Sequence, residues 1–261
     1  MSDADQLLRA GDLDGARAAL VEAVRAKPAD APTRMFLFQL LALAGEWAKA
    51  RTQLSTLAQL SPEAAMLSAV YGQAIDAEAT REAVFAGREL ATQHVASPWA
   101  DDLAQSIHHF ANGRRAQGEE ARARAFDAAP DTPGVIDGQA FDWIADADAR
   151  FGPAFEAVIG GRYGLQPFDG VERIESEGPM DLRDLVWFPV QIAFRDGRSI
   201  AALIPTRYPG SHASPDGAER LSRATGWRDG PAGEEGMGQR VLALSDGSER
   251  DLLSLRLLTF A

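Results

Sequence analysis

The chain has 261 residues, a length that favours two domains, and its apolar content is that of an ordinary globular protein. The absence of cysteine excludes disulfides, cysteine-ligated metals and cysteine nucleophiles. The net charge is −12 and both halves are acidic, which argues against nucleic-acid binding, and an acidic N-terminus without a long apolar run predicts a cytoplasmic protein with no membrane span.

A 34-residue repeat opens the chain. Gly11 and Gly45 are 34 residues apart, and so are the pairs Ala16 and Ala50 and Pro28 and Pro62. Glycine permits a tight turn between two helices, alanine permits their close approach, and proline ends a helix. This period is that of the tetratricopeptide repeat (TPR), in which pairs of helices stack into a superhelix. We therefore predict two helical hairpins here.

The third repeat is degenerate. Its first helix is expected from about Glu63, but the segment 77–85 has no glycine where the period places the turn. We expect one longer helix to about Ala91, followed by helices over about 98–112 and 117–129. The predicted TPR-like domain thus covers residues 1–130.

The first helix of the second repeat is apolar on every side, more than one buried stripe requires. Its surplus side chains predict a groove that accepts an amphipathic helix of a partner. The groove residues would be Met35, Phe36, Gln39 and Leu43, joined by Met66, Val70 and Gln73 of the third unit. The alternative is that these side chains pack against neighbouring helices.

The second half, residues 131–261, has the pattern of an α+β domain. After a glycine- and proline-rich linker we expect a helix over 142–159, ended by Gly160 and Gly161. Strands follow over 171–175, 186–194 and 199–204, the last two joined by an Asp-Gly hairpin turn, with a second hairpin around 242–248. A late apolar run ends at Phe260. The fold class is therefore α+β in two parts, TPR-like and then mixed with antiparallel strands.

The search for chemistry finds no catalytic motif. Asp142 and Asp146 would lie one turn apart on the expected helix and could share a hard cation, but an acidic helix start explains them equally well. The loop 205–211 places Arg207 and Tyr208 after a strand, either as a recognition surface or as a rigid turn with Arg207 paired to an acid such as Asp181 or Asp184. We predict no enzyme, no metal and no cofactor.

Three strings give the chain a family resemblance. Phe-Asp-Trp-Ile-Ala-Asp-Ala-Asp-Ala-Arg at 141–150, Asp-Leu-Arg-Asp-Leu-Val-Trp at 181–187 and Leu-Ile-Pro-Thr-Arg-Tyr-Pro-Gly-Ser at 203–211 resemble the ImpE family, also called TagJ or SciE-type proteins. So does Val-Phe-Ala-Gly at 84–87. The resemblance implies an accessory protein of bacterial type VI secretion that binds an N-terminal helix of the small sheath subunit TssB and is associated with the ATPase ClpV. It implies no catalytic residues.

The leading hypothesis is a non-enzymatic adaptor that binds the sheath peptide through its helical half. A second contact surface on the C-terminal domain would comprise Asp142, Trp143, Asp146, Arg183, Arg207 and Tyr208. One alternative is a small-ligand or enzymatic site centred on Asp142, Asp146 and Arg207, which requires these side chains to converge on a pocket. Another is a general TPR scaffold or co-chaperone with many clients.

Overall fold

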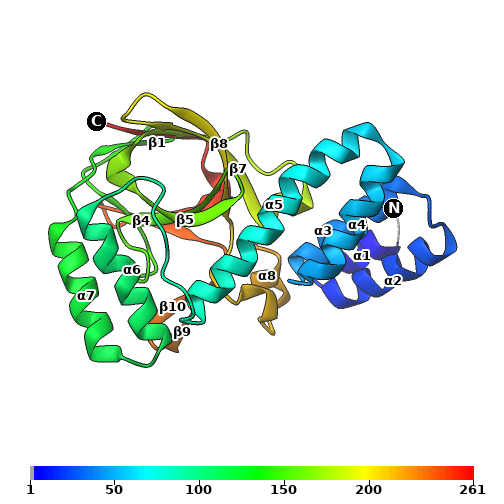
Figure 1. The fold of residues 1–261 in the computed structure, drawn as a ribbon, viewed down its shortest axis with the longest axis horizontal. Helices are drawn as coiled ribbons and strands as arrows, with labels where there is room; N and C mark the ends of the chain where they lie inside the picture. Colours follow the sequence, from blue (N-terminus) through cyan, green and yellow to red (C-terminus); the bar gives the residue numbers. More distant parts are fainter. Residues whose placement is uncertain (1–2) are drawn as a thin grey trace.

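The computed structural model describes residues 3–261, so residues 1 and 2 of the predicted helical domain lie outside the described part. Helices fill the first half of the chain, and a curved antiparallel sheet dominates the second (Figure 1). This arrangement confirms the predicted α+β fold class. The helices are α1 (Asp3–Arg9), α2 (Leu13–Ala26), α3 (Ala31–Leu43), α4 (Trp47–Leu60), α5 (Pro62–Phe85), α6 (Pro98–Ala111), α7 (Arg115–Ala128) and the short α8 (Gly217–Arg220).

The TPR pattern is visible in two helical hairpins, α1–α2 and α3–α4. Their turns contain Gly11 and Gly45, whose φ angles of +84° and +70° lie in the left-handed region that glycine adopts freely. Ala16 and Ala50 are fully buried where the helices approach. The starts of α2 and α3 are capped by side chains, as where Asp12 accepts a hydrogen bond from the Gly15 amide at 2.8 Å. The predicted hairpins are therefore confirmed.

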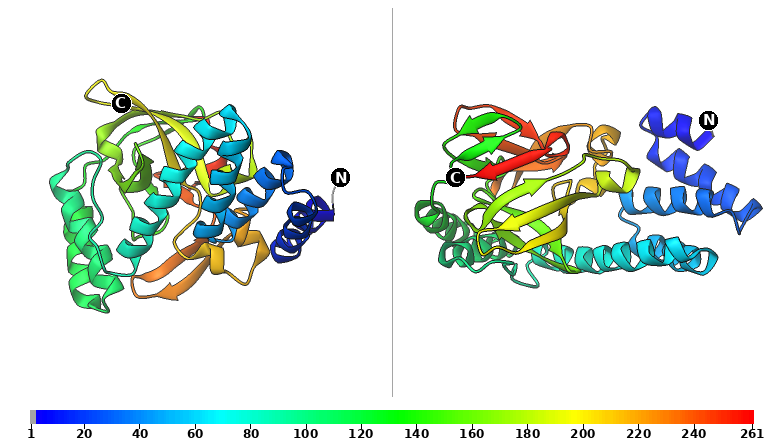
Figure 2. Two further views of the ribbon diagram at one scale, coloured as in Figure 1. Left: turned by 45° about the vertical axis from the view of Figure 1, so that its right-hand side comes forward. Right: turned by 90° about the horizontal axis from the view of Figure 1, so that it is seen from above.

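The third unit is a single helix, α5, of 24 residues. It begins at Pro62 with Ser61 as its cap and ends at Phe85, earlier than the predicted Ala91. The end is set by Gly87, whose φ of +69° cannot continue a right-handed helix. The α5 helix runs from the TPR hairpins to the sheet, whereas α6 and α7 pair at the far side of the molecule (Figures 1 and 2).

The two turn glycines allow a matched stability test. A Cβ added at Gly11 meets no atom within 4 Å, whereas one added at Gly45 comes within 2.6 Å of Cδ2 of His212. Gly11→Ala should therefore lower the free energy of unfolding by only the left-handed strain, about 1–2 kcal/mol. Gly45→Ala should cost more, because the turn must also separate from His212. Urea denaturation of both variants checks this, and equal losses would contradict it.

The C-terminal half contains an eight-stranded antiparallel sheet in the order β2-β1-β13-β6-β7-β8-β4-β5. Two smaller sheets, β12-β11-β3 and β10-β9, complete this half of the chain. The strands are β1 (Gly134–Ile136), β2 (Gln139–Phe141), β3 (Ile144–Asp146), β4 (Ala154–Ile159), β5 (Arg162–Pro167), β6 (Val171–Glu175), β7 (Trp187–Phe194), β8 (Ser199–Pro205), β9 (Thr225–Gly230), β10 (Gly233–Gly238), β11 (Val241–Leu244), β12 (Glu249–Asp251) and β13 (Leu257–Phe260). The predicted hairpins at 196–197 and 242–248 are the β7–β8 and β11–β12 connections.

The predicted helix over 142–159 is wrong. This segment forms β3, a turn and β4, and every residue of β4 is buried. Gly160 and Gly161 are the turn of the β4–β5 hairpin, with φ of +56° and +76°. Two consecutive residues with positive φ form the tight turn that suits a hairpin, and here they were misread as a helix end.

The apolar core crosses the predicted boundary at residue 130. The TPR helices share one buried cluster with Val186, Trp187 and Leu221 of the second half. The end of α5 shares another with α6, α7 and strands β4 and β5. A third fills the curved sheet. Within residues 3–261, none of the helices combines the length and apolarity needed to cross a bilayer.

Candidate functional site

The predicted groove on α3 is occupied by the protein's own chain. Leu43 and Gln39 are buried, and the Gln39 side-chain amide donates a hydrogen bond to Asp181. The short 3-10 helix Leu182–Leu185 lies against α3, and Leu182 and Leu185 pack on the TPR core. Gln39 and Leu43 are therefore not available to a partner, because both are buried within the chain itself.

The other predicted groove residues divide into two groups. Met35 and Phe36 are half-buried and pack against the TPR core, as the alternative interpretation requires. Met66 and Val70 are 76% and 48% exposed on α5, and Gln73 is exposed on the same helix. The structure thus separates the predicted set and leaves its α5 members on the surface.

The exposed part of α5 is a stripe at helical spacing, formed by Met66, Ala69, Val70 and Gln73. Positions separated by three, four and seven residues lie on one face of a helix. In a complete repeat the second helix of the unit would cover such a face. Here α5 continues instead of turning, and α6 packs against its far half, where Ala77 and Val84 contribute to the shared cluster. The missing helix therefore leaves an apolar stripe uncovered.

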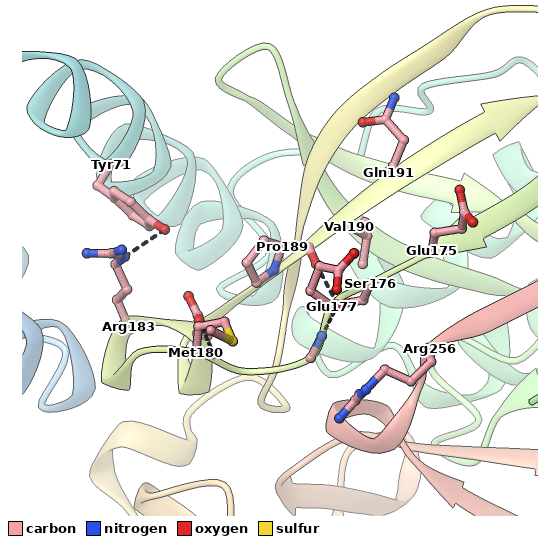
Figure 3. A pocket seen from close by; sticks show the side chains of 12 residues that line it. Tyr71, Glu175, Ser176, Glu177, Met180, Arg183, Pro189, Val190, Gln191 and Arg256 are labelled. Carbon is pink, nitrogen blue, oxygen red and sulfur yellow. Dashed lines mark hydrogen bonds between the residues drawn. The ribbon is translucent and has the colours of Figure 1, made fainter.

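A pocket of about 510 Å³ opens where α5 meets the second half (Figure 3). Tyr71 of α5 forms one side, and its hydroxyl accepts a hydrogen bond from Nε of Arg183 at 2.9 Å. The guanidinium also lies 4.9 Å from the centre of the Tyr71 ring. Met180 stands exposed at the mouth, and its backbone amide donates to Asp184 at 2.8 Å. Arg183, which the sequence places on the predicted contact surface, is thus half-buried and bonded to Tyr71.

A buried ionic network joins α5 to the sheet. Arg81 of α5 binds Glu156 of β4 with two nitrogens, at 2.7 and 3.0 Å, and the Tyr163 hydroxyl donates to the same carboxylate at 2.6 Å. Glu156 is completely buried and also pairs with Arg240. A buried charge is tolerated only when partners compensate it, and here arginines from two elements do so.

Asp146 continues this network. It binds Arg240 at 2.6 Å and accepts a hydrogen bond from the Tyr208 hydroxyl at 2.9 Å. Burial raises the pKa of Asp146, and the neighbouring Arg240 opposes that rise. Burial likewise lowers the pKa of Arg240 to about 10, and the negative charge of Asp146 opposes that fall. The paired charges hold strands and loops together and are turned away from solvent.

The expected convergence of Asp142, Asp146 and Arg207 does not occur. Asp142 is exposed, whereas Asp146 and Arg207 are buried in different surroundings. Arg207 donates to the backbone oxygens of Leu43 and Arg220, at 3.0 and 2.6 Å, rather than to a carboxylate. Its pKa is lowered to about 10 by burial. The small-ligand site fails on this geometry, and the expected pairing of Arg207 with Asp181 or Asp184 is wrong.

Few residues of the predicted second contact surface are exposed. Asp146, Arg207 and Tyr208 are interior, so only Asp142 and Trp143 of the predicted set are exposed. Within residues 3–261, no group of three or more histidines and acids is placed to hold a metal ion. The family strings at 141–150 and 203–211 therefore contribute mainly to the interior.

Sequence reasoning missed the residues that link the halves. These are Glu78, Arg81, Glu156, Trp187 and Arg240, which contact one another across distant parts of the chain. One signal was available for Glu156, a single charge within the otherwise apolar run 154–159. A lone charge in an apolar strand indicates a buried ion pair.

These features define a class of protein in which TPR-type helices are packed against an α+β domain. The family model described as ImpE protein matches residues 138–259, and a tetratricopeptide repeat model matches residues 7–73. The chain is 42% identical over 259 residues to the type VI secretion system accessory component TagJ of Pseudomonas aeruginosa, covering 98% of this chain and 90% of that one. It therefore belongs to the ImpE family, as its sequence resemblance predicts.

A solved structure has the same fold. The X-ray crystal structure of protein VPA1032 from Vibrio parahaemolyticus matches with a TM-score of 0.89 and covers 100% of this chain and 98% of that one. The sequences are 21% identical, so this likeness supports the fold alone. The same arrangement, with TPR helices packed against the sheet domain, therefore occurs in a protein of distant sequence.

Proposed function

We propose that this protein is a non-enzymatic accessory component of a type VI secretion system, acting in the bacterial cytoplasm. In this proposal it holds an N-terminal helix of the sheath subunit TssB and links the sheath to the ATPase ClpV. Membership of the ImpE family supports the secretion role. The observation that carries the peptide-binding role is the uncovered apolar stripe on α5, centred on Met66 and Val70.

The stripe suits an amphipathic helix for physical reasons. Exposed apolar side chains at helical spacing can take the apolar face of a second helix, as in other helix-binding grooves. Methionine adapts its shape to different apolar side chains, and Met66 is 76% exposed. A bound helix would occupy the place of the missing second helix of the third repeat. The site differs from the predicted groove because α3 contributes neither Gln39 nor Leu43.

Titration of a TssB N-terminal peptide against the full chain tests this proposal. We expect binding by the unaltered protein, and a loss of at least tenfold in affinity for the double variant Met66→Glu with Val70→Glu, since two charges would enter an apolar contact. Leu90→Glu is the matched control, because Leu90 is exposed beyond the other end of α5. Circular dichroism of all variants reports whether they fold.

Two results would overturn the proposal. One is the absence of binding by the unaltered protein up to about 1 mM peptide, which corresponds to about −4 kcal/mol. The other is equal peptide affinity in the folded α5 double variant and the control, which would exclude the stripe as the binding site. Retention of ClpV in a pull-down with the protein and sheath subunits tests the second link.

A further inference from the structure

A pocket of about 360 Å³ lies on the C-terminal half of α5, between this helix and the loop that follows β8. Its walls come from both, and the lining residues are Glu78, Arg81, Glu82, Phe85, Pro209, Gly210 and His212. Glu82 and Gly210 are exposed, so the pocket is open to solvent. The buried Glu78 lies deeper on the same helix.

The pocket is separate from the stripe that is proposed to hold the sheath helix. Positions 78, 82 and 85 share one face of α5, about 18 Å along the axis from Val70 and about a third of a turn away from the stripe. Two strings of the family resemblance reach the surface here, because Phe85 belongs to 84–87 and Pro209 to 203–211. The proposed function uses neither of these residues.

The carboxylate of Glu82 is held in place at the pocket but has no counter-charge. Its Oε1 atom accepts a hydrogen bond from the indole N–H of Trp47 at 2.7 Å. Within residues 3–261, no arginine, lysine or histidine forms an ion pair with Glu82, and its Oε2 atom accepts no bond. Such an oxygen can accept a charge-assisted hydrogen bond from a cation outside the chain.

The charges beneath Glu82 balance one another. The buried network holds three arginines and three acids, namely Arg81, Arg207, Arg240, Glu78, Asp146 and Glu156. Burial lowers the pKa of His212, so its ring is neutral at pH 7 and adds no charge. The surplus charge at the pocket is therefore the negative charge of Glu82, and a cation is favoured there.

Phe85 adds a ring to this carboxylate. The ring packs against Phe151, with the two centres 5.7 Å apart, so its position is fixed. It already lies 5.9 Å from the guanidinium of Arg150, which is itself paired with Asp148. The stem of an arginine can lie along such a ring while its planar head reaches a carboxylate, whereas lysine has no planar group to stack. The pocket therefore favours a guanidinium over an ammonium group.

We propose that this pocket binds an arginine side chain of a partner protein, with the guanidinium at Glu82 and the stem against Phe85 and Pro209. A side chain fits better than a free amino acid, because Arg81 is already bound to Glu156 and cannot take an α-carboxylate. The pocket gives the protein a contact in addition to the α5 stripe.

Three capped tripeptides, with arginine, lysine or citrulline between two alanines, are the probes, titrated against the ¹⁵N-labelled full chain at low salt. Citrulline has the shape of arginine without its charge. We expect the arginine peptide to shift the indole N–H resonance of Trp47, which is bonded to Glu82, and to leave that of the exposed Trp143 unchanged. The lysine peptide should bind at least threefold more weakly, and the citrulline peptide should cause no shift.

Variants assign the binding to Glu82. Glu82→Gln should weaken the affinity for the arginine peptide at least fivefold, although its amide oxygen can still accept the bond from Trp47. Glu89→Gln is the matched control, because Glu89 is exposed beyond the end of α5 and its loss changes the net charge equally. Circular dichroism reports the folding of both variants. Binding should persist in the α5 double variant Met66→Glu with Val70→Glu, which separates this site from the proposed function.

Four results would overturn the inference. Equal affinity of the Glu82→Gln and Glu89→Gln variants would show only general attraction to an acidic protein. Equal shifts with the arginine and citrulline peptides would exclude recognition of the charge. Tighter binding of agmatine than of the arginine peptide would assign the pocket to a free small molecule. Self-association that Glu82→Gln abolishes, measured by analytical ultracentrifugation, would assign it to a second copy of this chain.

Discussion

Replacing Arg240 with methionine is expected to lower the free energy of unfolding by about 3–5 kcal/mol, because it leaves the buried Asp146 without its counter-charge and Glu156 with Arg81 alone. Arg240 is buried and pairs with both Asp146 and Glu156. Its guanidinium also contacts the rings of Phe151 and Tyr208, 4.3 and 4.9 Å from their centres. Methionine can fill much of this space, so the loss measures the charge rather than a cavity.

Urea denaturation followed by circular dichroism measures the effect of Arg240→Met. The control is Arg198→Met, which breaks the exposed ion pair with Asp196 and should cost no more than about 1 kcal/mol. Adding Asp146→Asn to the Arg240 variant should restore part of the stability, since the neutral side chain removes the uncompensated charge, whereas Glu156 keeps Arg81 as its partner. A loss from Arg240→Met as small as that of the control would contradict the structural role of the network.

The helical half was largely predictable because its signals are local. The turn glycines Gly11 and Gly45 and the small Ala16 and Ala50 recur at a fixed period, and each acts through the hairpin that contains it. The helices α6 and α7 followed from similar local signals at their ends. What the pattern could not show is that the first half of α5 would pack on α4 but lack a second helix of its own repeat, since that depends on where α6 packs.

The segment 142–159 was misread because burial removed its strand signal. A strand that is half exposed alternates between apolar and polar residues, but β4 is buried on both faces and shows no alternation. Its length and the acids before it then favoured a helix. The two glycines that follow are compatible with either a helix end or a hairpin turn, and only the pairing of β4 with β5 decides between them.

The candidate site was predicted less well than the fold, because its contacts are non-local. The Gln39 side chain bonds to Asp181, 142 residues away, and Arg240 bonds to Asp146, 94 residues away. No periodicity carries such information. The exposed members of the predicted groove, Met66 and Val70, were included as residues of the third unit, beside the helix whose apolar surplus is visible in the sequence. That Leu43 would be covered by the chain itself was not visible.

Trp187 is the second residue whose loss should be large. It is fully buried between the helices and the sheet, and its ring centre lies 5.7 Å from those of both Trp47 and Tyr71. Its indole N–H donates to Glu78 of α5 at 2.9 Å. The side chain opens β7 and enters the TPR core, so it connects the two halves by packing and by a hydrogen bond to a charged group.

Trp187→Ala is expected to lower the free energy of unfolding by about 3–5 kcal/mol through the cavity it leaves. Trp187→Phe should cost less, about 1–3 kcal/mol, since it keeps most of the ring but leaves the Glu78 carboxylate without this donor. Trp143→Ala, at an exposed tryptophan, is the control and should cost about 1 kcal/mol or less.

Urea denaturation gives these values, and hydrogen exchange locates the effect. If Trp187 joins the halves, amides of α3, α4 and α5 should lose protection in the alanine variant before those of the central sheet. Uniform loss of protection, or a cost no greater than that of the control, would show that the helices are held to the sheet by other contacts.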